Sequence, residues 1–481
     1  MTHVLVADLG FGDAGKGTIV DWLCARGVDG RPVTAVVRFN GGGQAAHTVV
    51  LPDGRTHTFA QFGAGTLRPG VRTHLSRFMV VDPLSLAAEA DHLAALGVTD
   101  AFDRLTVDGA ALLATPWHRA ANRAREVARG ADRHGSCGHG VGETMAYALA
   151  HPDDAPRVAD CLAPARLGEK LALLRDRLAA ELGPPGAVGV PPVGDCVAAF
   201  AAFAARVTIV DGEHLARLLR TGPAVFEGAQ GVLLDEWHGF HPYTTWSTTT
   251  FANAETLLAE ADCAGPTVRL GVLRVCTTRH GAGPLVTEDP TLPLTDPHNP
   301  TNRWQGPFRF GHFDAVAHRY ALEVAGGVDG IALTHLDAAA PDLWICRRYD
   351  WTARLPVGPP GDLDRQAALT RRLASTVPHY DESPPTDRAG AVADALGTAV
   401  LVTSHGPTAD DKLLRSGVLG RKARPGGPGP GIRSGRLSPR RPVGCPGPGA
   451  SSSAPGRVFP AGGTGRVITS RIGKAAATPG T

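Results

Sequence analysis

The chain has 481 residues, of which 43% are hydrophobic and 20% charged, as is typical of folded globular proteins. Its net charge of +2 hides an asymmetry: thirteen Lys and Arg but no Asp or Glu follow Asp411, so residues 1–411 carry −11. This acidic body argues against a broad nucleic-acid surface, and no apolar run approaches the ~20 residues of a membrane span. We therefore expect neither nucleic acid nor a membrane as a partner.

The eight cysteines are scattered along the chain without a Cys-x-x-Cys pair or a metal-like cluster. No secretory signal precedes the first predicted strand, which begins at about His3. Thiols in this pattern are expected to be reduced, small core residues. The expected location of the chain is therefore cytoplasmic.

The first predicted element is a buried parallel strand at 4–9, followed by a glycine-rich loop and a helix beginning near Thr18. This order of elements aims backbone N–H groups at an anion, and Lys16 adds a charge suited to a phosphate oxygen. The loop nearly matches the Walker pattern, but Gly17 stands where a hydroxyl would bind Mg²⁺. It also carries Asp13, a carboxylate that is useful if the loop binds the metal or accepts a proton. The alternative is a strand-to-helix turn whose glycines serve close packing.

The other elements are predicted from apolar runs and turn residues. Strands are expected at 35–39, 224–226, 268–277, 330–333 and 400–403, a hairpin at 49–55, and helices at 84–96, 112–131, 163–220 (interrupted at 183–194) and 315–325. Strand after strand ends in a glycine-rich polar loop, and parallel α/β sheets bind ligands outside the carboxyl ends of their strands. We therefore predict an α/β fold with one composite site.

Residues 415–481 consist mainly of Gly, Pro, Ser, Arg and Ala without periodicity. Such a segment buries too little apolar surface to offset the entropy of ordering, so we predict a domain at 1–414 and a disordered tail at 415–481. Two alternatives stay open for the tail. It is either a basic segment that contacts nucleic acid or the frame-shifted translation of a GC-rich gene.

Seven motifs, in their order and spacing, resemble the adenylosuccinate synthetase family over about residues 3–414. They are Gly12-Asp-Ala-Gly-Lys-Gly17, Ala45-Ala-His-Thr48, Phe226-Glu-Gly-Ala-Gln-Gly231, His238-Gly-Phe-His-Pro-Tyr-Thr-Thr245, Thr278-Arg-His-Gly-Ala-Gly-Pro284, Thr334-His-Leu-Asp337 and Ser404-His-Gly-Pro407. The resemblance implies a large, mostly parallel sheet with helices on both faces, similar to P-loop NTPases. It also implies a homodimeric ligase of purine biosynthesis that makes adenylosuccinate from IMP, L-aspartate and GTP with Mg²⁺.

The resemblance assigns chemistry to individual residues. Asp13 would be the general base and, with the carbonyl of Ala46, a Mg²⁺ ligand; His47 would be the matching acid, and Gln230 completes the catalytic set. The implied binding residues are Gly12, Gly15, Lys16, Gly17, His47, Thr48, Asp337, Ser404, Gly406 and Pro407 for GTP; Asp13, Gln44, Ser136, Cys137, Gln230, Thr245 and His280 for an IMP-like nucleotide; and Thr301, Arg303 and Arg309 for the amine donor. The structural alternatives are a loop cap for His47, a turn for Asp337 and a core amide for Gln230.

The sequence departs from the family pattern in several places. Gln44 replaces an asparagine and Ser136-Cys137 a threonine pair, and the arginine that reaches across the dimer has no clear counterpart. The loop that normally binds aspartate is rich in arginine, because carboxylates bind guanidinium forks. Here it reads Thr301-Asn-Arg-Trp-Gln-Gly-Pro-Phe-Arg309, with two arginines. The activation half of the site therefore matches the family, whereas the donor half is rewritten.

Three functions are compatible with these observations. The first is a GTP-dependent ligase that joins L-aspartate, or a related amine donor, to a 6-oxopurine nucleotide such as IMP through a 6-phosphoryl intermediate. The second is a GTP-binding regulator or inactive paralogue, which has no physical need for Asp13 and His47. The third is a secondary-metabolism enzyme that acts on a purine-analogue nucleotide and shares every motif with the first.

Overall fold

The computed structural model describes residues 1–130, 133–183, 190–301, 303–340 and 342–415. The chain divides into two compact units, Met1–Ala423 and Arg424–Thr481, the second of which lies outside the described residues. Except for Arg415, the tail predicted to be disordered at 415–481 also lies outside them.

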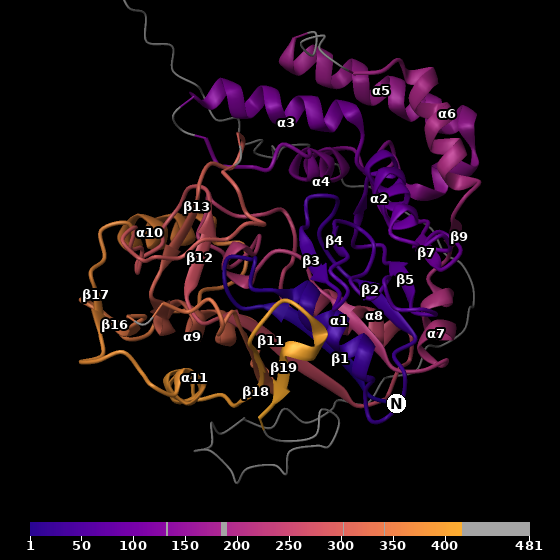
Figure 1. Ribbon diagram of the computed structural model, residues 1–481. Helices are drawn as coiled ribbons and strands as arrows, with labels where there is room; N and C mark the ends of the chain where they lie inside the picture. The colour runs from indigo at the N-terminus through magenta and orange to yellow at the C-terminus, as the bar shows by residue number, and fades with distance from the viewer. Residues whose placement is uncertain (131–132, 184–189, 302, 341, 416–481) are drawn as a thin grey trace, which may run out of the picture. The chain divides into compact units, whose positions relative to one another are not determined.

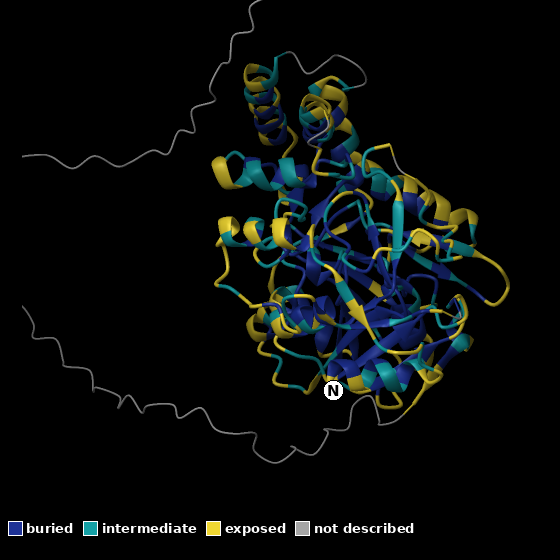
Figure 2. Cartoon of the chain, turned by 90° about the vertical axis from the view of Figure 1, so that its left-hand side faces the viewer, coloured by how far each residue is buried: buried dark blue, intermediate teal, exposed yellow. Residues whose placement is uncertain are grey.

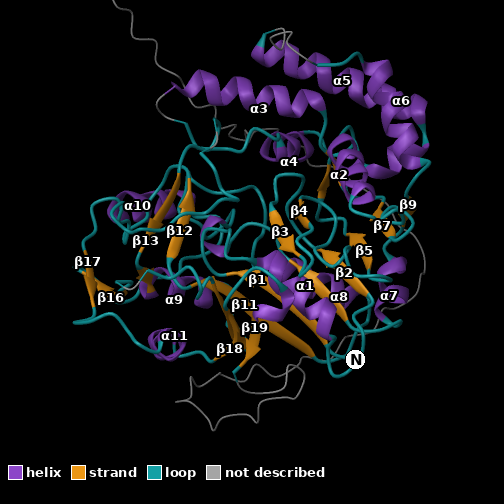
Figure 3. Cartoon of the chain, viewed as in Figure 1, coloured by secondary structure: helices purple, strands orange, loops and turns teal. Residues whose placement is uncertain are grey.

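A ten-stranded sheet runs through the first unit, and Figure 3 shows its strands in orange. Every pair of neighbouring strands is parallel except the antiparallel pair at one edge, which confirms the predicted mostly parallel sheet. The order is β19 (Lys412–Leu414), β18 (Val400–Ser404), β15 (Gly330–Thr334), β11 (Thr267–Arg274), β1 (His3–Asp8), β10 (Ala224–Glu227), β2 (Ala35–Arg38), β5 (Arg72–Leu75), β7 (Leu105–Asp108) and β9 (Thr208–Val210).

Helices cover both faces of this sheet, as predicted. Alternate residues of the buried strand β1 enter two different hydrophobic clusters, Val4 and Val6 on one face and Leu5 and Ala7 on the other. The first cluster packs against α1 (Lys16–Arg26), α2 (Pro83–Ala95), α3 (Pro116–Arg129), α4 (Val141–Ala150), α5 (Pro164–Leu182) and α6 (Val193–Ala204). The second packs against α7 (Glu213–Leu219), α8 (Ala252–Glu260), α9 (Ala315–Val324), α10 (Leu363–Leu373) and α11 (Arg388–Leu396).

The figures show where these layers lie. In Figure 1, α3, α4, α5 and α6 gather at the top of the view, where α3 contacts both α4 and α5. Figure 2 shows the central strands buried in dark blue and much of the outer helix surface exposed in yellow. The hydrophobic core therefore lies on the two faces of the sheet, and its strand ends carry the loops considered below.

Smaller sheets complete the unit. The pair β3 (His47–Val50) and β4 (Thr56–Phe59) forms the predicted hairpin, with Gly54 in the turn at a φ of +87°. The others are β6 (Val80–Val81) with β8 (Leu112–Leu113), β12 (Thr277–His280) with β13 (Phe308–Gly311), and β14 (Phe313–Asp314), β16 (Ile345–Tyr349) and β17 (Pro378–Tyr380). Short 3₁₀ helices span Val158–Leu162, Val232–Leu234 and Ala409–Asp411.

Two predicted helical ranges were partly wrong. The helix predicted at 112–131 begins only at Pro116, because residues 112–113 pair as β8 and the Thr115 hydroxyl caps the helix by accepting the His118 N–H at 3.3 Å. The range 163–220 contains β9, whose three β-branched residues pair with the neighbouring strand β7. Pairing with a sheet edge therefore overrode the helical pattern there.

No helix in the described ranges is long and apolar enough to cross a membrane. All seven described cysteines are free thiols, and the eighth, Cys445, lies outside the described residues. Five of the seven are buried: Cys24, Cys161, Cys196, Cys276 and Cys346. This agrees with the expectation that most cysteines are small core residues.

Candidate active site

A cavity of 1110 Å³ lies at the carboxyl ends of the parallel strands. The loops that follow β1, β2, β10, β15 and β18 line it, together with the last residue of β11. This is the edge at which parallel α/β sheets bind ligands. All the candidate residues named from the sequence line this one cavity, except Arg303 and Arg309.

Asp13 lies on the cavity wall in a backbone conformation that usually requires glycine, with a φ of +59°. Contacts from two neighbouring strands hold this part of the loop. Arg274 donates from Nε to the carbonyl oxygen of Asp13 at 2.6 Å, and the Thr334 hydroxyl donates to the carbonyl oxygen of Ala14 at 2.7 Å. Burial raises the pKa of the Asp13 carboxyl, although the charges of Lys16 and Arg274 oppose this. Asp13 is thus a stronger base than an exposed aspartate.

The ammonium group of Lys16 is held inside the protein. It donates to Oδ2 of Asp8 at 3.0 Å, and the same carboxylate accepts the N–H groups of Gly10 at 2.8 Å and Ala14 at 2.9 Å. Lys16 and Asp8 are only 3% and 1% exposed. Asp8, which sequence reasoning missed, therefore neutralises Lys16 and accepts hydrogen bonds from the backbone of the loop. The amides of Gly15 and Gly17 stay candidates for phosphate binding.

His47 is paired with Glu227, a carboxylate that was quoted within a motif but given no role from the sequence. Nδ1 of His47 lies 2.6 Å from Oε1 of Glu227, and Oε2 of Glu227 accepts the Ala64 N–H at 2.9 Å. Burial lowers the pKa of His47 to about 4, against the opposing effect of Glu227. Burial would raise the pKa of Glu227, but Arg38 and the hydrogen bonds from His47 and Ala64 outweigh it, so that this pKa is lowered. We infer a neutral imidazole that donates from Nδ1 and keeps Nε2 as its second polar atom.

Two amide side chains carry unsatisfied oxygens in the cavity wall. Oε1 of Gln44 and Oε1 of Gln230 are buried without a hydrogen-bond partner among the described residues. Gln230 also has a positive φ, +58°. Buried polar atoms are normally paired, so these two oxygens are candidates for ligand contacts.

The other nucleotide candidates are held by local contacts. Asn122 Nδ2 donates to Ser136 Oγ at 2.8 Å, and burial raises the pKa of the neighbouring Cys137 thiol. The backbone N–H of Thr245 donates to the Leu234 carbonyl oxygen at 2.8 Å. The remaining contacts are His280 Nε2 to the Gly306 oxygen at 3.2 Å, Thr48 Oγ1 to Thr58 Oγ1 at 3.0 Å and Ser404 Oγ to the Gly406 oxygen at 3.1 Å.

The residues proposed to bind the guanine base of GTP come from the later part of the sequence, between 337 and 407. Asp337 is exposed on the loop after β15 and lines the cavity. Pro407 lines the same cavity from the loop after β18, and its carbonyl oxygen accepts the Thr18 hydroxyl at 2.8 Å. Lys412 secures this loop by donating to the carbonyl oxygens of Gly406 at 2.8 Å and Thr408 at 2.6 Å.

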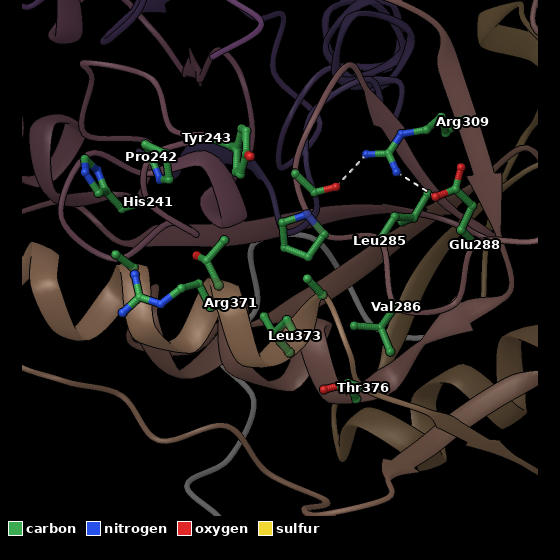
Figure 4. Close-up of a pocket in the computed structure, with 15 residues that line it drawn as sticks. His241, Pro242, Tyr243, Leu285, Val286, Glu288, Arg309, Arg371, Leu373 and Thr376 are labelled. Carbon is green, nitrogen blue, oxygen red and sulfur yellow. Dashed lines mark hydrogen bonds and ion pairs between the residues drawn. The ribbon is translucent and has the colours of Figure 1, made fainter. Parts of the chain in front are cut away.

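The two arginines proposed for the amine donor point elsewhere. The guanidinium of Arg303 lies over the Trp304 ring, 5.2 Å from its centre. Arg309 donates to the carbonyl oxygens of Gly281 at 2.9 Å and Gly283 at 2.8 Å, and to Glu288 at 2.6 Å. Arg309 lines a second pocket of 480 Å³, drawn in Figure 4, where its guanidinium points toward Glu288. Of the donor residues predicted, Thr301 lines the main cavity.

A Mg²⁺ ion fits the donor set of the main cavity. The described residues contain no group of three His, Cys, Asp or Glu that could hold a metal by itself. Mg²⁺, however, is usually bound by one or two protein carboxylates together with substrate phosphates and water. The Asp13 carboxylate and the Ala46 carbonyl, both on the cavity wall, suit such a site.

The chain is similar to known proteins over most of its length. Residues 5–387 match the family model for adenylosuccinate synthetase. The chain is 33% identical over 440 residues to the adenylosuccinate synthetase of Acidithiobacillus ferrooxidans, covering 87% of this chain and 99% of the relative. It is 34% identical over 410 residues to that of Anaeromyxobacter dehalogenans strain 2CP-1, covering 80% and 87%.

Two solved structures share the fold. The fully ligated adenylosuccinate synthetase of Plasmodium falciparum matches with a TM-score of 0.70 and 20% identity, over 86% of this chain and 100% of that one. The succinoaminodeoxyadenylate synthetase of cyanophage S-2L, bound to dGMP and dATP, matches with a TM-score of 0.52 and 18% identity, over 87% and 97%. At these identities the likeness concerns the fold alone.

Proposed function

The chain belongs to the adenylosuccinate synthetase family of GDP-forming carbon–nitrogen ligases, and on that premise we propose that it joins an amine donor to C6 of IMP or a close 6-oxopurine analogue. GTP would be the phosphoryl donor, and GDP and phosphate would be released. L-aspartate is the donor that the family resemblance implies, and it would give adenylosuccinate.

The observation that carries this proposal is that Asp13 and His47 line one cavity, with the His47 imidazole paired to Glu227. Asp13 would take the N1 proton of the purine, which makes the 6-oxygen nucleophilic. That oxygen would attack the γ-phosphorus of GTP, breaking its bond to the β,γ-bridging oxygen and releasing GDP. The amine would then displace the phosphate from C6 and lose a proton. His47 would take up a proton on Nε2 as the phosphates bind, while Nδ1 keeps donating to Glu227, and would then donate a hydrogen bond from Nε2 to the transferring phosphoryl group.

The remaining roles follow from placement. The unsatisfied oxygens of Gln44 and Gln230 would accept hydrogen bonds from the nucleotide, and the exposed carboxylate of Asp337 would accept them from guanine. Mg²⁺ held by the Asp13 carboxylate and the Ala46 carbonyl would neutralise phosphate charge. A homodimer and a cytoplasmic location are proposed from the family resemblance.

Phosphate release measured with purified protein, GTP, Mg²⁺, a panel of purine monophosphates and a panel of amines tests the proposal. We expect release to depend on both the nucleotide and the amine. Asp13→Asn should abolish turnover while GTP binding, measured by calorimetry, persists. Tight GTP binding without nucleotide-dependent phosphate release for any combination would contradict the proposal and favour a GTP-binding regulator.

A further inference from the structure

The cations around the main cavity already have partners within the protein: four are in ion pairs, and Arg279 donates to main-chain carbonyl oxygens. Five Lys or Arg residues line the cavity in the described part of the chain, and each donates to a carboxylate or to main-chain carbonyl oxygens. A negatively charged substrate group would therefore compete with an existing partner at every one. The pairs are Lys16 with Asp8 at 3.0 Å, Arg125 with Glu143 at 3.0 Å and Glu181 at 2.9 Å, Arg129 with Glu126 at 2.5 Å, Arg274 with Asp296 at 2.5 Å, and Arg279 with the carbonyl oxygens of Ala282, Pro284 and Tyr243 at 2.8, 3.0 and 3.2 Å.

The segment expected to bind the amine donor contributes no cation to the cavity wall. From 295 to 305, the described residues that line the cavity are Thr295, Asp296, Pro297, His298, Asn299, Pro300, Thr301 and Gln305. These residues include one carboxylate and no Lys or Arg, so the charge they bring to the cavity wall is negative. It belongs to Asp296, which also accepts the His298 N–H at 2.9 Å and the Asn299 amide at 3.0 Å.

Arg309 is not available to replace the missing cations. Its guanidinium makes three hydrogen bonds that brace the turn at 281–283 and neutralise Glu288. Rotating it into the main cavity would break all three and leave Glu288 without this partner. The position of Arg309 in the wall of the second pocket agrees with a bracing role (Figure 4).

Arg303 offers a single positive charge at the edge of the donor segment. It is exposed, and its guanidinium stacks on Trp304. Arg123 of α3 lies over the same ring at 5.6 Å from its centre. The ring itself rests on Gly138, where a Cβ would come within 3.1 Å of the indole. The Trp304 indole therefore packs against Gly138 and two guanidinium groups, while the guanidinium of Arg303 stays near solvent.

We propose that the amine donor of this chain carries at most one carboxylate, and is a neutral amino acid or a simple amine rather than a dicarboxylate such as aspartate. This inference rests on the proposed ligase function. A carboxylate transferred from water into the cavity needs a cation or several N–H donors to offset its desolvation. Arg303 lies outside the cavity wall and can meet one carboxylate only by leaving the Trp304 ring, whereas a second carboxylate would face paired cations and the charge of Asp296.

The first experiment separates this inference from the function on which it rests. GTP labelled with ¹⁸O in the β,γ-bridge is incubated with Mg²⁺ and each purine monophosphate, without amine. Reversible phosphoryl transfer lets the label exchange into non-bridging positions of the β-phosphate. Exchange that depends on the nucleotide supports the ligase function whatever the donor is, and its absence with every nucleotide overturns both proposals.

The second experiment compares donors with the nucleotide that supports exchange. Values of kcat/KM are measured by phosphate release for aspartate, glutamate, alanine, serine, asparagine and ammonium. We expect at least one neutral donor to exceed aspartate by about tenfold or more, the cost of one poorly paired carboxylate. Exchange combined with the highest kcat/KM for aspartate, or with no turnover of any neutral donor, would overturn the inference while leaving the function intact.

A charge-addition variant tests the physical cause. Thr301→Arg places a cation on the cavity wall, and Thr291→Arg is the matched control, because Thr291 is also exposed, ten residues earlier in the chain, but does not line the cavity. Thr301→Arg should raise kcat/KM for aspartate relative to alanine by about tenfold. An equal change in both variants, or none in either, would show that missing cations do not set donor choice and would overturn the inference.

Discussion

Arg274 donates a hydrogen bond from Nε to the main-chain carbonyl oxygen of Asp13 at 2.6 Å. Its Nη2 also donates to Asp296 at 2.5 Å, and its guanidinium lies over the Phe308 ring at 5.4 Å from the centre. One side chain therefore holds the proposed base at its positive φ and connects it to Asp296 and Phe308, which lie on either side of Thr301 and Arg303 in the sequence. Its charge also opposes the rise in the Asp13 pKa that burial causes.

Arg274→Gln should therefore change the pH dependence of the reaction as well as its rate. Asp13 must be ionised to act as a base, so activity is lost as the pH falls through its raised pKa. Removing the Arg274 charge raises that pKa further, and the acid limb of kcat should move to higher pH by roughly one unit. Arg269→Gln, at a half-buried position near the start of the same strand, is the control. A lower melting temperature with an unmoved pH profile would mean that Arg274 is only structural.

Glu227→Gln should lower kcat by about 10²-fold or more, because His47 loses the partner that orients its ring. Single-turnover phosphate release measures the effect on phosphoryl transfer itself. Glu89→Gln is a matched control for losing a buried carboxylate: Glu89 accepts the N–H groups of residues 60–62 and lies near His57, but it pairs with none of the proposed catalytic residues. Equal losses of kcat in the two variants would contradict a role for Glu227 in the reaction.

Lys16→Met should destabilise the protein more than it weakens nucleotide binding. It leaves the buried carboxylate of Asp8 without its cation, which costs about 3–5 kcal/mol in the free energy of unfolding. Adding Asp8→Asn to this variant should recover part of the loss, as urea denaturation can measure. If Lys16→Met instead kept its stability and lost GTP affinity, the lysine would serve the phosphates directly.

Asp337→Asn should weaken the use of GTP, because the exposed carboxylate would lose its ability to accept two hydrogen bonds from guanine. A bidentate pair to a base contributes about 1–3 kcal/mol, so kcat/KM for GTP should fall roughly 10- to 100-fold while XTP becomes a better substrate. Asp342→Asn, at a nearby exposed site outside the cavity, should leave both values unchanged. Unaltered GTP use in Asp337→Asn would place the guanine elsewhere.

Chelation of divalent cations should abolish turnover, because the phosphates of GTP need a counter-ion beyond the paired cations of the cavity. Excess EDTA is added to the working assay, and Mg²⁺ is then titrated back until phosphate release recovers. Asp13→Ala should raise the Mg²⁺ concentration needed for nucleotide binding, measured by calorimetry. Full activity in excess EDTA would contradict the proposed metal site.

Gly17 shows what the local sequence pattern explains about a position and what only the tertiary structure explains. The sequence indicates that a hydroxyl is missing from a Walker-like loop, and it offers no reason for the replacement. In the folded chain a Cβ at this position would lie 2.9 Å from the carbonyl carbon of His47, so that only glycine fits. The close approach of the helix start to the strand that carries His47 therefore excludes a side chain.

Apolar runs and the turn residues between them determined most elements in the sequence, because they report local backbone preference and burial. The glycine loops at strand ends and the order of seven motifs determined the α/β fold class and the family. Only the tertiary structure decided the partners: Lys16 meets Asp8, Arg309 braces a turn, and Glu227 and Arg274 reach residues 180 and 261 positions away. Such contacts depend on which strands become neighbours in the sheet, and no local pattern encodes that neighbourhood.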